Sequence, residues 1–294
     1  MDFWKMYAFR WDRDIIQKWP SLKKTGYLLL PLLFYFVIHD VAEIILWACL
    51  DFVMQHATEE IKLLFTANTD TVRGIINGSS ILIGTALIWP AIRNEIRGND
   101  THVAYETTEV ETAQKISIYG FVLAFAFCMA LGLNILFYQL GITGKSQNFE
   151  VVKELQYGVQ FIFGLILYGV VSPFAEEAVF RGLLYNRMKR CFSIGIAVVL
   201  SALLFGFYHG NMVQALYGTI LGIVIAYLYE MTGRFEVPFL FHAMANVSVY
   251  VMTYHGALSG INPMLAWVLA VVLLLMAAGF FVYLRKICKE TMDD

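Results

Sequence analysis

The sequence predicts an all-α, polytopic integral membrane protein: a helical bundle of about eight transmembrane helices, preceded by an N-terminal interfacial helix. Composition is the first reason, because 59% of the 294 residues are hydrophobic, 15% are charged and the mean hydropathy is +0.64. A soluble domain is nearer half apolar and about a quarter charged. The other two reasons are a succession of long apolar segments and a strongly uneven distribution of lysine and arginine.

The chain divides into two parts on this evidence. Residues 1–25 mix aromatic and basic side chains and predict an amphipathic segment in the membrane interface, with a short solvated helix or a tail as the alternative. Residues 26–290 predict a single membrane-embedded domain without internal repeats. Its eight apolar segments, of which the fifth and seventh are short for the ~20 residues that a span needs, are 26–53, 72–92, 116–140, 156–185, 193–209, 212–230, 237–254 and 264–286.

Several function classes find no support in the sequence. The four cysteines have neither the CxxC pattern nor the spacing of metal ligands, so no disulfide framework is predicted. No glycine-rich phosphate loop or nucleic-acid signature is present, so the predicted partners are membrane lipid and a peptide or protein, without nucleic acid. The N-terminus lacks the uninterrupted apolar stretch of a cleaved signal peptide, and the predicted location is the bacterial plasma membrane.

Ionisable residues occur within the first span. His39, Asp40 and Glu43 lie close together in an otherwise apolar segment, and Asp40 and Glu43 are three residues apart, so they can share a helix face. One interpretation is a contact with substrate or a proton. The other is a polar seam that faces the bundle interior or a water-filled cavity.

Residues 171–190 carry the strongest functional signal. Glu176, Glu177 and Arg181 lie inside a long apolar run, where ionisable groups are costly and mark function by default. Glu177 and Arg181 are four residues apart, so a carboxylate and a guanidinium can meet on one helix face. Glu176 points about 100° away from Glu177 and has no obvious local partner. Pro173 removes a backbone donor just before this group and predicts a kinked or loosened helix.

Two further polar pairs follow. Phe205 and His209 are four residues apart at the end of the fifth segment, and His242 and Asn246 are four apart in the seventh. A helical hairpin turning near residues 190–193 would place Glu176 and His209 side by side, each roughly 21–24 Å from the turn. A carboxylate beside an imidazole can deprotonate a water, and His242 and Asn246 can donate hydrogen bonds to an oxyanion, so amide hydrolysis is the predicted reaction class.

These motifs resemble a known family. EEAVFR matches an E-E-x-x-x-R motif, FGFYH an F-x-x-x-H motif and HAMAN an H-x-x-x-N motif. Their order and spacing are similar to those of the CPBP family of intramembrane proteases, which includes CAAX prenyl endopeptidases and bacterial proteins linked to bacteriocin processing and self-immunity. The resemblance covers a protease-like core of about residues 156–255.

The resemblance implies an intramembrane glutamic endopeptidase that needs no metal or other cofactor and cleaves a peptide or protein, including membrane-associated or prenylated substrates. It assigns water activation to Glu176 and His209, the oxyanion hole to His242 and Asn246, and a supporting role to Glu177 and Arg181.

Three other functions stay open on the sequence. A zinc hydrolase could use Glu176, His209 and His242 as ligands with a water in the fourth position, although no HExxH motif is present. A non-enzymatic membrane scaffold or immunity protein would bind a peptide or a partner helix instead. A transporter could relay protons through the buried carboxylates, but no inverted repeat supports this.

The basic residues predict the orientation in the membrane and a direct test of it. With both termini in the cytoplasm, 17 of the 21 lysines and arginines fall on the inner side, including those near Arg190. Single cysteines in the 93–115 and 142–155 loops of a cysteine-free variant should therefore react differently with an impermeant thiol reagent on intact cells. We expect only the 142–155 position to be labelled, and labelling at 93–115 would contradict the orientation.

Overall fold

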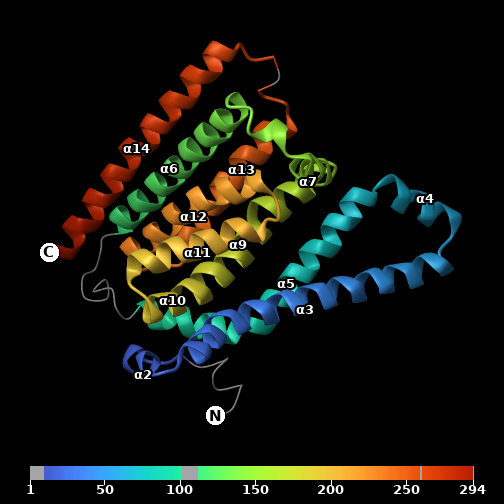
Figure 1. Ribbon diagram of the computed structural model, residues 1–294. Helices are drawn as coiled ribbons and strands as arrows, with labels where there is room; N and C mark the ends of the chain where they lie inside the picture. The colour runs from blue at the N-terminus through green and yellow to red at the C-terminus, as the bar shows by residue number, and fades with distance from the viewer. Residues whose placement is uncertain (1–9, 101–111, 259, 294) are drawn as a thin grey trace.

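The computed structural model describes residues 10–100, 112–258 and 260–293, and these residues form helices without any strand (Figure 1). The all-α prediction is therefore confirmed. The helices pack as a bundle in which a hairpin from the first third of the chain leans against a larger group from the rest.

Six of the described helices are long and apolar enough to cross a membrane, so the chain is a polytopic membrane protein, but the predicted count of eight is not reached. The two remaining segments form α11 (Ile194–Tyr208) and α13 (Glu236–Tyr254). With 15 residues, α11 is about 22 Å long, whereas the hydrocarbon core is about 30 Å thick. In α13 the polar residues Glu236, His242 and Asn246 reduce the hydropathy. The six helices are Ser21–His56, Thr69–Gly98, Ser117–Gln139, Phe161–Cys191, Met212–Thr232 and Pro263–Cys288.

The N-terminal hairpin consists of α3 (Ser21–His56) and α5 (Thr69–Asp100), joined at its far end by α4 (Glu59–Ala67). The two long helices come close at Gly84, where an added Cβ would lie 3.1 Å from the ring of Tyr35. Many apolar side chains of α3 are exposed, as expected for a helix that faces lipid.

The predicted interfacial segment is described only from residue 10 onward. Its helix α2 (Arg13–Gln17) buries Ile16 completely in the same core as Tyr27 of α3. The Gln17 side chain donates a hydrogen bond of 3.1 Å to the Arg190 carbonyl. This part of the segment therefore packs on the bundle; residues 1–9 lie outside the described residues.

The C-terminal half supplies the other wall of the molecule. Helices α6 (Thr112–Gln139) and α14 (Pro263–Asp293) lie side by side, and α13 packs on α6. Phe125 of α6 and Phe241 of α13 meet edge to face, 5.2 Å between ring centroids, in a core that also includes residues of α12 (Met212–Thr232). A short helix, α7 (Gln147–Tyr157), lies between α6 and the central helix.

The central helix, Phe161–Cys191, is irregular at the sequence that predicts function. It runs through α8 (Phe161–Ile166), the π-helical η3 (Leu167–Val171), α9 (Ser172–Glu177), the π-helical η4 (Ala178–Tyr185) and α10 (Asn186–Cys191). Pro173 lies in the first turn of α9, directly after η3. Because proline cannot donate to the preceding turn, the loosening predicted at Pro173 takes the form of a π segment. The two carboxylates of the EE motif lie on the short α-helical stretch between the π segments.

Two glycines turn the chain so that α11, α12 and α13 meet. Gly210, between α11 and α12, has φ of 70°, and Gly233, which caps α12, has φ of 65°. These left-handed conformations favour glycine. At Gly206 the helices α11 and α12 approach so closely that an added Cβ would overlap the Thr219 hydroxyl and the Ala215 carbonyl oxygen.

We predict that Gly206→Ala destabilises the bundle, because the Ala215 carbonyl belongs to a helix backbone and cannot rotate away. The expected loss is about 1–3 kcal/mol in the free energy of unfolding, the usual cost of overpacking. Gly195→Ala is the matched control, because it lies in the same helix and its added Cβ would have no neighbour within 4 Å. Unfolding in mixed micelles should separate the two variants, and equal stabilities would contradict the close contact.

Candidate active site

A cavity of about 790 Å³ lies among α3, α5, α6, α7, α11, α12, α13 and the central helix. The four residues that the sequence predicts to be catalytic, Glu176, His209, His242 and Asn246, all line it. Much of the remaining wall is aromatic and includes Phe205, Tyr208, Tyr217 and Tyr250. The three motifs, which are far apart in the sequence, therefore meet at one enclosed space.

Glu176 has two polar neighbours at this cavity. Its Oε1 accepts a hydrogen bond of 2.7 Å from the Ser172 hydroxyl, one helical turn earlier, and its Oε2 lies 3.8 Å from Nε2 of His242. Its side chain retains 12% exposure, which is consistent with access from the cavity. The sequence analysis missed Ser172, although its spacing of four residues from Glu176 was a visible signal.

Glu177 is fully buried and contacts two groups through one oxygen. Its Oε1 accepts from Nη1 of Arg181 at 3.0 Å and lies 2.8 Å from Nδ1 of His242. A carboxylate oxygen bonded to Arg181 is an acceptor, so Nδ1 is the protonated nitrogen of His242. The second ring nitrogen, Nε2, is thereby directed toward Glu176.

Arg181 has no exposure and ties this group to two other helices. Its Nη2 donates to the Gly222 carbonyl of α12 at 3.1 Å, and its guanidinium stacks 4.5 Å from the centroid of the Phe205 ring. A Cβ at residue 222 would lie 3.1 Å from Cα of Ala202 and 3.2 Å from Nη2, so glycine permits the approach of α11, α12 and the arginine. The buried ion pair is thus held by hydrogen bonds and by a cation–π contact.

His209 ends α11, where its Nδ1 lies 2.9 Å from the Phe205 carbonyl. Because a carbonyl only accepts, Nε2 is the acceptor nitrogen in the neutral ring. The Phe205 ring meets His209 and His242 edge-on, 5.0 and 5.5 Å between centroids. Glu176 and His209 share the cavity but form no ion pair in the described part of the chain; the imidazole nearest Glu176 belongs to His242.

Asn246 faces the same cavity one turn after His242. Its Nδ2 donates to the Tyr168 carbonyl at 3.0 Å, inside the π-helical η3. One amide hydrogen is therefore committed to the central helix, and the second is free to serve another acceptor. This bond also joins α13 to the turn that precedes Glu176.

The polar residues of the first span, His39, Asp40 and Glu43, lie in two different environments. His39 lines the cavity, whereas the Asp40 side chain is 71% exposed. The two side chains are in contact, 3.0 Å between Nδ1 and Oδ1, and Nε2 of His39 is 4.0 Å from Glu43. Only His39 of this group therefore reaches the cavity wall, and the two interpretations of the sequence apply to this residue.

A metal site requires a different arrangement from the one described. Within residues 10–100, 112–258 and 260–293, no group of three or more His, Cys, Asp or Glu side chains is placed to hold a metal ion. Glu176 and His242 are close, but Nδ1 of His209 is bonded to its own helix. The three side chains suggested as zinc ligands do not converge in this arrangement.

The buried contact predicts strong coupling between its two charged members. Arg181→Ala would leave Glu177 charged and buried beside His242, at a cost of about 3–5 kcal/mol, whereas Arg73→Ala, which breaks a half-exposed pair with Asp70, should cost about 0–1 kcal/mol. In a double-mutant cycle, Glu177→Ala should remove most of the penalty of Arg181→Ala. Additive changes in unfolding free energy would mean that the two side chains do not act as partners.

Comparison with known proteins finds similarity to membrane peptidases, as the three motifs do. Residues 158–248 match the family model of the type II CAAX prenyl endopeptidase Rce1-like proteins. A protein of Bacillus subtilis (strain 168) described as "Putative membrane peptidase YdiL" is 29% identical over 136 residues, which cover 46% of this chain and 54% of that protein. The chain thus matches about half the length of this relative. No solved structure matches the chain.

Neither match concerns bacteriocin processing, which stays a prediction of the motif resemblance. The matched stretch contains all three motifs and every residue of the candidate site that they contribute. Residues 158–248 are thus similar to the Rce1-like type II CAAX prenyl endopeptidase family, which is the family that the three motifs resemble.

Proposed function

We propose that this protein is an intramembrane endopeptidase that hydrolyses a peptide bond with a water activated by Glu176. One observation carries the proposal: the Glu176 carboxylate faces His242 across 3.8 Å at a cavity that His209 and Asn246 also line. A carboxylate, imidazoles and an amide donor around an enclosed space are the parts that amide hydrolysis needs.

The first step is proton abstraction from water. Two atoms 3.8 Å apart can both hydrogen-bond to one water oxygen, so Oε2 of Glu176 and Nε2 of His242 can hold the nucleophile between them. Glu176 takes one proton while the water oxygen bonds to the peptide carbonyl carbon. When the C–N bond breaks, this proton passes to the leaving amine. His209, which also lines the cavity and contacts the Phe205 ring, assists this step.

The second requirement is stabilisation of the oxyanion. Asn246 has one amide hydrogen left to donate. His242 can donate from Nε2 after Glu176 passes the abstracted proton to that nitrogen, and the same proton then goes to the leaving amine. The Glu177 carboxylate, 2.8 Å from Nδ1, stabilises the positive charge on the ring. Arg181 in turn holds the Glu177 carboxylate in place through their hydrogen bond, which is the supporting role expected of the pair.

The proposed substrate is a peptide segment that reaches the site from within or beside the membrane, including prenylated peptides. The aromatic wall favours apolar side chains or lipid groups. Side chains of α7 form part of the cavity wall, and by the distribution of basic residues α7 lies on the outer side of the membrane. We therefore propose that this part of the cavity is extracytoplasmic, in a chain with both termini in the cytoplasm.

The zinc hydrolase, the scaffold or immunity protein and the transporter are the alternatives that experiment must separate. Cleavage of a peptide by purified protein in detergent separates an enzyme from the last two. Loss of cleavage with phenanthroline and its return with zinc would identify the zinc hydrolase.

The central prediction is that Glu176→Gln yields a folded protein without peptidase activity. Glutamine keeps the shape and accepts a hydrogen bond from Ser172, but it cannot take the proton from water. His209→Ala and His242→Ala should also be inactive. Asn246→Ala should lose less, about 2.7–4 kcal/mol of barrier stabilisation, the usual effect of one oxyanion donor.

The measurement is initial-rate cleavage of a fluorogenic peptide, with thermal unfolding in the same detergent as the test of folding. Glu59→Gln is the matched control, since Glu59 is an exposed carboxylate on α4 paired with Lys62. Wild-type rates from Glu176→Gln would reject the glutamate mechanism. Sensitivity to chelators would replace it with the zinc mechanism.

A further inference from the structure

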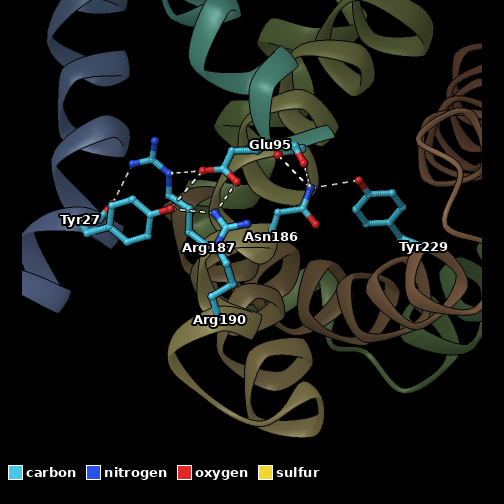
Figure 2. Close-up of polar contacts among 7 residues, drawn as sticks. Tyr27, Glu95, Asn186, Arg187, Arg190 and Tyr229 are labelled. Atoms are coloured by element: carbon cyan, nitrogen blue, oxygen red, sulfur yellow. Dashed lines mark hydrogen bonds and ion pairs between the residues drawn. The ribbon is translucent and has the colours of Figure 1, made fainter. Parts of the chain in front are cut away.

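A second group of buried charges lies on the same central helix, beyond the EE motif (Figure 2). Glu95 of α5 is 1% exposed and pairs with two arginines of α10: Nε of Arg187 lies 2.9 Å from Oε1, and Nη2 of Arg190 contacts Oε2. The Tyr27 hydroxyl of α3 contacts Glu95 at 3.1 Å and Arg190 at 2.7 Å. The Tyr27 carbonyl accepts from Arg187 at 2.9 Å, and its ring lies 4.3 Å from the Arg187 guanidinium.

Asn186 extends this network to the helix backbone. It is fully buried, and its Nδ2 lies 3.0 Å from the Gly182 carbonyl and 3.0 Å from the Tyr229 hydroxyl of α12. The Glu95 carbonyl is also within reach, at 3.5 Å (Figure 2). Gly182 lies inside η4, and an added Cβ there would be 3.1 Å from the side chains of Ile92 and Ile96 of α5. Helix α5 therefore contacts both η4, at Gly182, and Asn186, the residue that follows η4.

The π segment η4 separates two parts of one helix, and their rotation relative to each other about the helix axis must stay fixed. Glu177 directly precedes η4, and Asn186 directly follows it. A π turn contains one residue more than an α turn, so relaxation of one such turn would rotate the two parts against each other by about 100°. π-helix is rare and occurs mostly as single turns at functional sites, so its persistence over eight residues implies support at both ends.

The two ends of η4 are both held by buried ionic contacts. At one end Glu177 meets Arg181 and His242, and at the other Arg187 and Arg190 meet Glu95. The ionic partner at the first end comes from α13, and the partner at the second end comes from α5, with Tyr27 of α3 beside it. Helix α12 contacts both ends, through the Gly222 carbonyl and the Tyr229 hydroxyl. Glu95 and Tyr27 lie outside residues 158–248, so the matched family core does not contain this support.

We propose that Glu95 is a positioning residue of the active site: through Arg187 and Arg190 its carboxylate keeps η4 π-helical and thereby sets the orientation of Glu176. The proposal rests on the proposed peptidase function. In this proposal the N-terminal hairpin contributes to catalysis, because α3 and α5 fix the rotation of the central helix that carries the EE motif.

Kinetics provide the first test. Glu95→Gln should lower kcat about tenfold to a hundredfold, the size of effect that a displacement of about 1 Å can have. The change in KM should be smaller, because Glu95 itself does not line the cavity. Tyr27→Phe keeps the ring and all three charges, so it should fold and lose less. Glu95→Asp should restore part of the kcat lost in Glu95→Gln, and Glu59→Gln, an exposed carboxylate, should match the wild type.

A distance measurement provides a readout that does not depend on activity. Val170 and Phe192 are both exposed, and they lie on either side of the EE motif and of the two arginines that contact Glu95. Spin labels at these two positions therefore report the distance between the two parts of the central helix. The four native cysteines are replaced by alanine for this purpose. We expect the distance distribution to shift or broaden in Glu95→Gln and to a smaller extent in Tyr27→Phe, and to stay unchanged in Glu59→Gln.

The outcomes separate this inference from the proposed function. A wild type that cleaves, with Glu95→Gln and Tyr27→Phe at wild-type kcat, would overturn the positioning role and leave the peptidase intact. Loss of kcat without a change in the distance distribution would also overturn it. If Glu95→Gln fails to fold, the same comparison is made with Tyr27→Phe and Glu95→Asp. If the wild type cleaves no peptide, the proposed function fails, and an unchanged distance distribution would reject the positioning role as well.

Discussion

The contact among Glu177, Arg181 and His242 is the constraint on which the rest of this structure depends. A charge removed from water is costly unless it is paired and its remaining hydrogen-bonding positions are used. Here one carboxylate oxygen serves both partners, and the guanidinium also reaches a carbonyl of α12 and the ring of Phe205. The central helix, α11, α12 and α13 must therefore keep their positions for this buried ion pair to stay paired, although Oε2 of Glu177 and Nε of Arg181 have no hydrogen-bond partner among the described residues. The same contact orients the imidazole that faces Glu176.

The spacing of residues in the sequence was sufficient to predict which polar side chains belong together. Glu177 and Arg181 lie four apart on one helix, and His242 and Asn246 on another, so local geometry alone brings each pair to one face. The relation between helices could not be obtained this way: hairpin geometry placed His209 beside Glu176, whereas the closest imidazole is that of His242.

Other features depend on the environment of a residue more than on its type. Glu95 lies in a polar stretch of the sequence that resembles an exposed helix end, yet it is almost fully buried. Its partners are Arg187 and Arg190, which lie 92 and 95 residues later in the chain, so no local pattern indicates the contact. The π segments have no periodicity of their own in the sequence. Eight spans were predicted and six helices of the described residues are long and apolar enough to cross a membrane. The difference is α11, which is too short, and α13, which is too polar; both pack against neighbouring helices with part of their surface.

Helix α7 differs from the rest of the cavity wall, because none of its residues is buried, although Phe149, Glu150 and Lys153 line the cavity. Substitutions on this helix remove little from the core and leave every contact of Glu176, Glu177 and His242 unchanged. Variation on α7 can therefore change this part of the cavity wall while the candidate site stays constant. The shape and charge of the cavity can thus change through one short helix, separately from the residues of the three motifs.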